Sequence, residues 1–270
     1  MLIDAYEERW LERLNEPSGE MLFLLIDGAF LPGLYRRIRS TGMEVALLFE
    51  TLPACSDATR DVSPFLVPWS GGNCRFETLL CECSGMPMVS AISTKETLFE
   101  LTERLAAWCV IEADGQRFNF RFTDTRRLPA IYEALSLQQR AQLIGLTSRW
   151  AYIGRDGIWR ALALSVGVDA IADRPTLDDC QFARLVGESE ADEVIANLEY
   201  LGASHITSPS HRYEVVSRAL QYTAKADLTV ADKLAWCDFC TAAATAPDCG
   251  EIAKSFERWM EVSRSPELTT

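Results

Sequence analysis

The sequence predicts an α/β lobe, a mixed sheet with flanking helices, over residues 1–165, followed by an all-helical lobe over residues 166–270. Short apolar runs typical of strands recur as far as Leu162. Two pairs of these runs are separated by Asp-Gly, the turn dipeptide typical of a β-hairpin. After about residue 170 these runs stop, and helical periodicity continues alone. With 48% apolar residues, the chain can bury a sizeable core.

The first elements follow from local patterns. Residues 1–14 are predicted to form an amphipathic helix because apolar residues recur every four positions, at Tyr6, Trp10 and Leu14. Met21–Ile26 is an uninterrupted apolar run, which predicts a buried strand that ends at Asp27-Gly28. A helix is expected over residues 30–40, since proline is tolerated in a first helical turn.

Further strands are expected at residues 45–49, 65–69 and 88–92. Ser93 and Glu96 then have the spacing of a capping box, which predicts the start of a helix. Two hairpins are expected around Asp114-Gly115 and Asp156-Gly157, and Ser136 with Gln139 predicts another capped helix between them.

The C-terminal lobe is predicted from caps and apolar stripes. One or two helices are expected over residues 176–201. Ser208-Pro209 is a cap followed by proline at the first helical position, and Thr229 with Asp232 starts another helix. A last apolar face comprises Ile252, Phe256, Trp259 and Met260.

Charge and hydropathy exclude several classes of protein. The net charge of -13 argues against a nucleic-acid binder, which needs a positive face. A membrane span needs about 20 consecutive apolar residues, and the N-terminal run from Met21 to Ile26 is far shorter. The acidic first residues are unlike a signal peptide. We therefore expect a cytoplasmic protein without a membrane partner.

The cysteines and histidines offer few catalytic candidates. Nine irregularly spaced cysteines predict free, metal-free thiols, and Cys237 and Cys240 lie in a helical pattern that favours core packing over zinc ligation. The two histidines, His205 and His211, lie in a polar loop beside a helix start, and no nucleophile-elbow motif accompanies them. We expect them at the surface or in caps.

Two aspartates at strand ends allow two interpretations. Asp27 follows one strand and Asp124 another, so the pair could hold a magnesium ion in a metal-dependent hydrolase or nuclease. Alternatively, both are caps that accept hydrogen bonds from N–H groups of the next helix. Capping is favoured because the motif around Asp27 carries no second acid. Three arginines flank Asp124, namely Arg121, Arg126 and Arg127. They could bind an anion or form structural ion pairs.

Four motifs in order resemble the domain of type VI secretion effector chaperones, the Tap or Tec adaptors. They are FLLIDGAFLPGLYRRIR, PFLVPW, the helix predicted after Ser93, and FNFRFTDTRRL. The resemblance covers residues 21–150. It implies a cytoplasmic adaptor that binds a toxic effector and loads it onto the VgrG spike, with no catalysis and no cofactor.

The resemblance carries over to particular positions. The matching residues are Asp27, Gly28, Pro32 and Tyr35, then Pro64, Phe65 and Leu66, then Phe120, Arg121, Phe122, Asp124 and Arg126. The last of these three groups lies in FNFRFTDTRRL, which we call the third motif. It departs from the family, which has an aromatic before the acid and a proline after it. Thr123 and Thr125 stand at those positions, which predicts a looser turn.

Partner binding is expected to divide between the lobes. The helical lobe is expected to bind the cognate effector, through exposed members of a set of aromatic residues, and the α/β lobe to bind the spike. That set is Tyr213, Trp236, Phe256 and Trp259. If these residues are core instead, their substitution would unfold the lobe.

Overall fold

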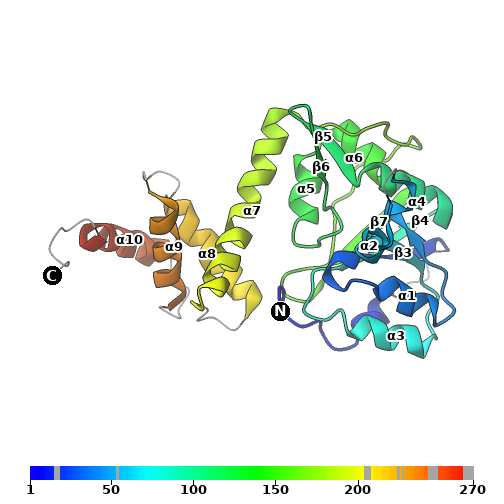
Figure 1. Ribbon diagram of the computed structural model, residues 1–270, viewed down its shortest axis with the longest axis horizontal. Coiled ribbons are helices and arrows are strands. Elements are labelled where there is room, and N and C mark those ends of the chain that lie inside the picture. The colour runs from blue at the N-terminus through cyan, green and yellow to red at the C-terminus, as the bar shows by residue number, and fades with distance from the viewer. Residues whose placement is uncertain are drawn as a thin grey trace. The chain divides into compact units, whose positions relative to one another are not determined.

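The computed structural model describes residues 1–14, 19–52, 55–203, 208–223, 226, 228–242 and 249–263. The chain divides into two compact units, Met1–Glu188 and Ser189–Thr270 (Figure 1). The first combines a sheet with helices and the second is helical, which confirms the predicted fold class.

The elements of the first unit alternate between short strands and short helices. The strands are β1 Met21–Ile26, β2 Ala46–Leu47, β3 Phe65–Pro68, β4 Val89–Thr94, β5 Val110–Ala113, β6 Gln116–Asn119, β7 Thr147–Ile153 and β8 Trp159–Ala161. The α-helices are α1 Leu34–Arg39, α2 Asp57–Asp61, α3 Cys74–Cys81, α4 Leu98–Ala107, α5 Leu128–Ala134 and α6 Leu137–Ile144. The 3₁₀-helices are η1 Trp10–Leu14, η2 Gly28–Phe30 and η3 Leu48–Thr51.

Helix α7, Asp179–Tyr200, begins in the first unit and ends in the second. The second unit continues with α8 Pro209–Thr223, α9 Val230–Ala242 and α10 Cys249–Ser263. The predicted caps are present, since the Ser208 hydroxyl accepts from the His211 N–H, and Thr229 and Asp232 cap α9 reciprocally. The described part of the chain has no strand after β8.

Six strands form the main sheet, in the order β2-β3-β1-β4-β7-β8, and each neighbouring pair is antiparallel. The hairpin β5-β6 stands apart as a second sheet. Both predicted Asp-Gly turns connect hairpin strands. The longest pairing of β1 is with β4, which follows it much later in the sequence, so the sheet depends on contacts that no local pattern specifies.

The sheet has an apolar core on each face. In β1, Phe23 and Leu25 belong to one core, and Leu24 and Ile26 to the other, as the alternation of a strand requires. Helices α4, α5 and α6 pack on the first face, and α1 and α3 on the second; Figure 1 shows α5 and α6 on the opposite side of the sheet from α1 and α3. Burial on both faces explains why β1 is apolar throughout.

The N-terminal segment is not the predicted amphipathic helix. Only Trp10–Leu14 is helical, as a 3₁₀-turn, and Arg9 has a left-handed φ of 60° that interrupts any longer helix. The segment is held instead by distant backbone: the Asp4 N–H donates to the Arg155 carbonyl (2.9 Å), and the Trp159 indole donates to the Trp10 carbonyl (2.9 Å). Its apolar residues cover one end of the second sheet face.

The predicted capping box at Ser93 is also wrong. Ser93 lies inside β4, opposite Leu22 of β1. The box is formed four residues later by Thr97 and Glu100, whose side chains each accept from the other's backbone N–H. Both pairs have the same spacing, and strand pairing decides between them.

The first unit extends past residue 165, the boundary predicted from the sequence. The chain between β8 and α7 is irregular and packs onto the first core, where Ala172 and Leu177 are buried. The Leu177 N–H donates to the Glu112 carbonyl (2.9 Å), and the Glu112 N–H to the Pro175 carbonyl (3.0 Å). The sequence shows no strand pattern in this segment, because the segment forms one isolated β-bridge and not a continuous strand pairing.

Among the described helices, none combines the length and the apolar character that crossing a membrane requires.

Candidate functional site

Asp27 lies where β1 ends, and its carboxylate is a meeting point for two distant segments. The residue is 1% exposed. One oxygen, Oδ1, accepts from the Ala29 N–H (3.0 Å) and so caps η2, as predicted. The other, Oδ2, accepts from the Arg121 guanidinium (2.9 Å) and from the Thr123 hydroxyl (2.9 Å). All three donors therefore stabilise one buried negative charge.

Two arginines of the third motif also contact the first motif through an aromatic ring. The Cζ atoms of Arg121 and Arg126 lie 4.9 Å and 5.9 Å from the centre of the Phe30 ring. These distances are within the range of cation–π attraction. The Arg121 side chain is 39% exposed, so this junction reaches the surface. We name the set Asp27, Phe30, Arg121, Thr123 and Arg126 the motif junction.

Asp124 closes the turn that follows this strand region. Its Oδ1 accepts from the Arg126 N–H (3.1 Å), and the Arg126 guanidinium donates to both of its oxygens. The turn is anchored because the Thr125 N–H donates to the Pro87 carbonyl (2.9 Å) just before β4. The threonines that depart from the family pattern therefore do not give a loose turn, since Thr123, Asp124 and Thr125 are all buried.

Gly28 is required by a close approach to the second motif. A Cβ on Gly28 would lie 2.3 Å from the carbonyl oxygen of Ser63, which precedes Pro64. The Pro64 carbonyl in turn accepts from the Leu48 N–H (2.9 Å), and Phe65 and Leu66 pair with β1 as part of β3. The first and second motifs are thus adjacent in space.

Most of the remaining motif residues are buried in the first unit. Tyr35 is buried, with the guanidinium groups of Arg36 and Arg39 over its ring, whereas Pro32 is exposed. Phe120 and Phe122 are buried and continue an aromatic chain that links Trp108 to Trp150. The third motif therefore lies on the first core, and its arginines face the first motif.

The aromatic residues expected to bind a partner form the core of the second unit. Trp236 is 0% exposed, and its indole N–H donates to the Ala219 carbonyl (3.1 Å). Tyr213, Phe256 and Trp259 are half-buried and pack against the same core. Trp236 therefore has no surface for a partner, whereas Phe239, which stacks on it, is 48% exposed.

The described thiols are free. Burial raises the pKa of Cys237 and of Cys240 to about 12, so neither forms a reactive thiolate near neutral pH. Over the described residues, no group of three or more His, Cys, Asp and Glu side chains has the geometry to hold a metal ion. His211 is half-buried beside Glu214, and His205 lies outside the described residues.

Each candidate carboxylate is paired with an arginine in this arrangement. Asp27 is paired with Arg121, Asp124 is paired with Arg126, and Arg127 donates to the Leu185 carbonyl (3.2 Å). A cation at either carboxylate would compete with a bound guanidinium. Arg121 and Arg126 thus form the structural ion pairs that were one of the two interpretations, whereas Arg127 bonds to a backbone carbonyl.

A buried ion pair between Arg104 and Glu96 was not found by sequence reasoning. Both side chains are 2% exposed, and the Arg104 Nε donates to Glu96 (2.6 Å). Arg104 also donates to the carbonyls of Gln142 and Ala170 and so holds the chain after β8 against α6. Its i+8 spacing from Glu96 carries no recognised local signal, so the sequence could not have shown it.

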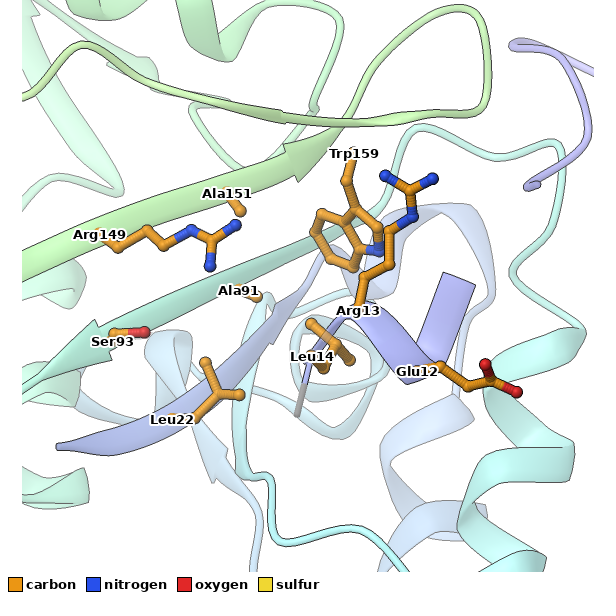
Figure 2. A pocket seen from close by; sticks show the side chains of 9 residues that line it. All are labelled: Glu12, Arg13, Leu14, Leu22, Ala91, Ser93, Arg149, Ala151 and Trp159. Atoms are coloured by element: carbon orange, nitrogen blue, oxygen red, sulfur yellow. The ribbon is translucent and has the colours of Figure 1, made fainter. Parts of the chain in front are cut away.

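A hollow on the second sheet face was also not predicted. It has a volume of about 480 Å³ and lies across β1, β4 and β7, with Leu14 and Trp159 on its sides (Figure 2). The sequence contains a weak signal for it, because Ala151 stands between Trp150 and Tyr152, whereas Ala91 lies in a strand of mostly small residues. Only the strand register shows that these alanines lie opposite each other.

Residues 22–142 match the model of a family described as a domain of unknown function, DUF4123. The matched stretch is slightly less than half of the chain. It begins in β1, ends in α6, and contains all residues of the motif junction. No curated protein and no solved structure matched the chain. The second unit lies wholly outside the matched stretch.

Proposed function

We propose that this protein is a cytoplasmic type VI secretion adaptor that binds a cognate toxic effector and loads it onto the VgrG spike. The resemblance of its ordered motifs to the effector chaperones supports this proposal. The stretch that carries the resemblance, residues 21–150, is nearly the stretch that matches the domain of unknown function, residues 22–142. The proposal assigns no catalytic step and no cofactor.

The observation that carries the proposal is the motif junction. Arg121 and Thr123 follow Asp27 in the sequence by 94 and 96 positions, and both donate hydrogen bonds to its buried carboxylate. The motifs that resemble the adaptors therefore build one contiguous piece of the fold. Their polar residues bind one another, which supports a binding scaffold over an open catalytic centre.

The two units suggest a division of binding tasks. We propose that the first unit contacts the spike and the helical unit contacts the effector, through half-buried Tyr213, Phe256 and Trp259 and the exposed Phe239. Phe239→Ala is the suitable variant, because Trp236→Ala would create a core cavity costing about 3–5 kcal/mol. Loss of effector capture by Phe239→Ala, with spike capture retained, is the expected result.

A secretion assay tests the function. In a strain lacking this protein, a tagged toxin made by the same cell should be absent from spike complexes and from the medium, and a plasmid copy should restore both. A toxin carried by an unrelated spike serves as the control and should be exported normally. Unchanged spike association and export of the cognate toxin in the deletion strain would refute the proposal.

A further inference from the structure

Strand β8 ends the main sheet, and the backbone on its outer side is open. Hydrogen-bonded and non-bonded residue pairs alternate along its antiparallel pairing with β7. The Gly154 N–H donates to the Ile158 carbonyl (2.9 Å), so residues at even positions of this strand bond to β7. The N–H and C=O groups of Trp159 and Ala161 therefore point outward. Within the described part of the chain, nothing hydrogen-bonds to these four groups.

The outer edge of β8 lacks the usual protection of an edge strand. Natural edge strands carry charges, prolines or bulges that prevent pairing with another chain. From Ala161 to Val168, no residue is charged and none is proline. The one charged residue of β8, Arg160, is paired with Asp156. Ala161 is exposed and small, so another strand can approach the backbone closely.

Side-chain packing holds this edge in its extended conformation. Leu162 and Leu164 pack against the first core, whereas Trp159 is directed toward Leu14 on the second face (Figure 2). A partner strand would therefore meet a backbone that is already ordered, which lowers the entropy cost of pairing. The other edge strand, β2, has two residues and leads directly into η3, so it offers a shorter template.

We propose that the outer edge of β8 docks an extended, uncharged segment of a partner protein, which adds a strand to the main sheet. The outward backbone groups of Trp159 and Ala161 supply the hydrogen bonds, as in other cases of β-strand addition. Charge matching selects an uncharged segment, because a charge placed along Ala161–Val168 would lose water without gaining a counter-charge. Whether the effector or the spike supplies the segment rests on the proposed function.

The test uses the full chain and a blocked hexapeptide, acetyl-(Thr-Val)₃-amide, N-methylated at its three valines. This peptide keeps free N–H groups on one edge only, so it can pair with β8 but cannot extend into an aggregate. The control is the same hexapeptide N-methylated at all six residues, which carries methyl groups on both edges. The two peptides have the same side chains, so only backbone pairing distinguishes them.

Amide hydrogen exchange measured by nuclear magnetic resonance reports the pairing. The outward amides of Trp159 and Ala161 should exchange about two- to tenfold more slowly at about 10 mM peptide, if the dissociation constant is about 1–10 mM. The Arg160 amide is the internal reference, because it already faces β7 and should not change. The fully methylated peptide should slow neither outward amide.

Two variants at Ala161 test the edge. Ala161→Pro removes one outward N–H and keeps the bonds to β7, since proline is tolerated where the strand N–H faces away from the sheet. It should abolish the slowing at Trp159, whereas Ala161→Thr, which keeps the N–H, should preserve it. The remaining amide signals report whether each variant is folded. If Ala161→Pro is not folded, the two peptides on the unmodified chain still decide.

Three results would overturn the proposal: no slowing with the half-methylated peptide, equal slowing with both peptides, or slowing that survives in folded Ala161→Pro. Sedimentation tests a second copy as the occupant. A dimer that Ala161→Pro dissociates would assign the edge to self-association and also overturn the proposal.

The secretion assay gives a separate answer. Toxin export that does not depend on this protein would refute the adaptor function, while the peptide result would stand. Absence of peptide pairing in a protein whose deletion blocks export would refute the docking edge alone.

Discussion

The motif junction predicts the effect of Asp27→Ala on the stability of the first unit. The substitution removes the acceptor of three hydrogen bonds at the end of β1. Losing the cap of η2 costs about 1 kcal/mol. The Thr123 hydroxyl, in a residue 3% exposed, is left without its acceptor, which costs about 1–3 kcal/mol. Arg121 can turn to water, so its lost pair costs about 0–1 kcal/mol.

The sum is about 2–5 kcal/mol of unfolding free energy, which corresponds to about 30- to 5,000-fold faster amide exchange in β1 if exchange requires opening of the unit. Hydrogen exchange measured by mass spectrometry resolves this for each unit. Peptides from α8 are the internal reference, because they belong to the second unit and should exchange as before. Asp57→Ala, at an exposed carboxylate on α2, is the matched control and should change stability by less than about 0.5 kcal/mol.

A double-mutant cycle sharpens the test. Arg121→Ala leaves the Asp27 carboxylate with two donors but no counter-charge, and we expect a cost of about 1–3 kcal/mol. Because the two residues share one contact, the double variant should lose less than the sum of the single losses. Exchange in β1 that rises less than about threefold in Asp27→Ala would refute the reasoning, and so would strict additivity.

Three further predictions concern glycines and thiols. Gly28→Ala should lower the unfolding free energy by about 1–3 kcal/mol, because its Cβ would overlap the Ser63 carbonyl; an unchanged urea midpoint would contradict this. Gly187→Ala should stabilise α7 by about 0.5–1 kcal/mol, since a Cβ there meets no atom within 4 Å, and exchange in α7 should slow. Iodoacetamide at pH 8 should label the exposed thiols and spare the buried thiols, whose pKa burial raises. Labelling of a buried thiol in the native protein, located by mass spectrometry, would refute the assignment. The exposed group is Cys74, Cys81 and Cys180, and the protected group is Cys83, Cys109, Cys237 and Cys240.

Local patterns predicted the elements whose structure is decided within a few residues. The strand at Met21–Ile26 was located to the residue, and both Asp-Gly hairpins formed, because apolar runs and turn dipeptides act at short range. The capping box at Ser136 and Gln139 is present for the same reason. The cap at Asp27 was also predicted, since it depends on the next two residues only.

Elements decided by distant contacts were missed. The four-residue repeat of the N-terminal segment was interpreted as a helix, but its aromatic residues are spaced to cover the sheet, with Arg9 in a left-handed conformation. Ser93 and Thr97 each begin a sequence with the spacing of a capping box. Only the pairing of Ser93 with β1 shows that the box at Ser93 does not form. The partners of Asp27 and the hollow over Ala91 depend on tertiary contacts in the same way.

The binding of the N-terminal segment to the end of β7 and the β8 hairpin sets an order for folding during synthesis. Asp4, Glu7 and Trp10 are held by Arg155, Gly157 and Trp159. At about 5–20 residues per second, a ribosome makes the first group roughly 7–30 s before the last. In that interval the apolar side chains near the N-terminus have no complete sheet to cover. The second face can therefore close only after translation has passed the whole stretch that matches the domain family.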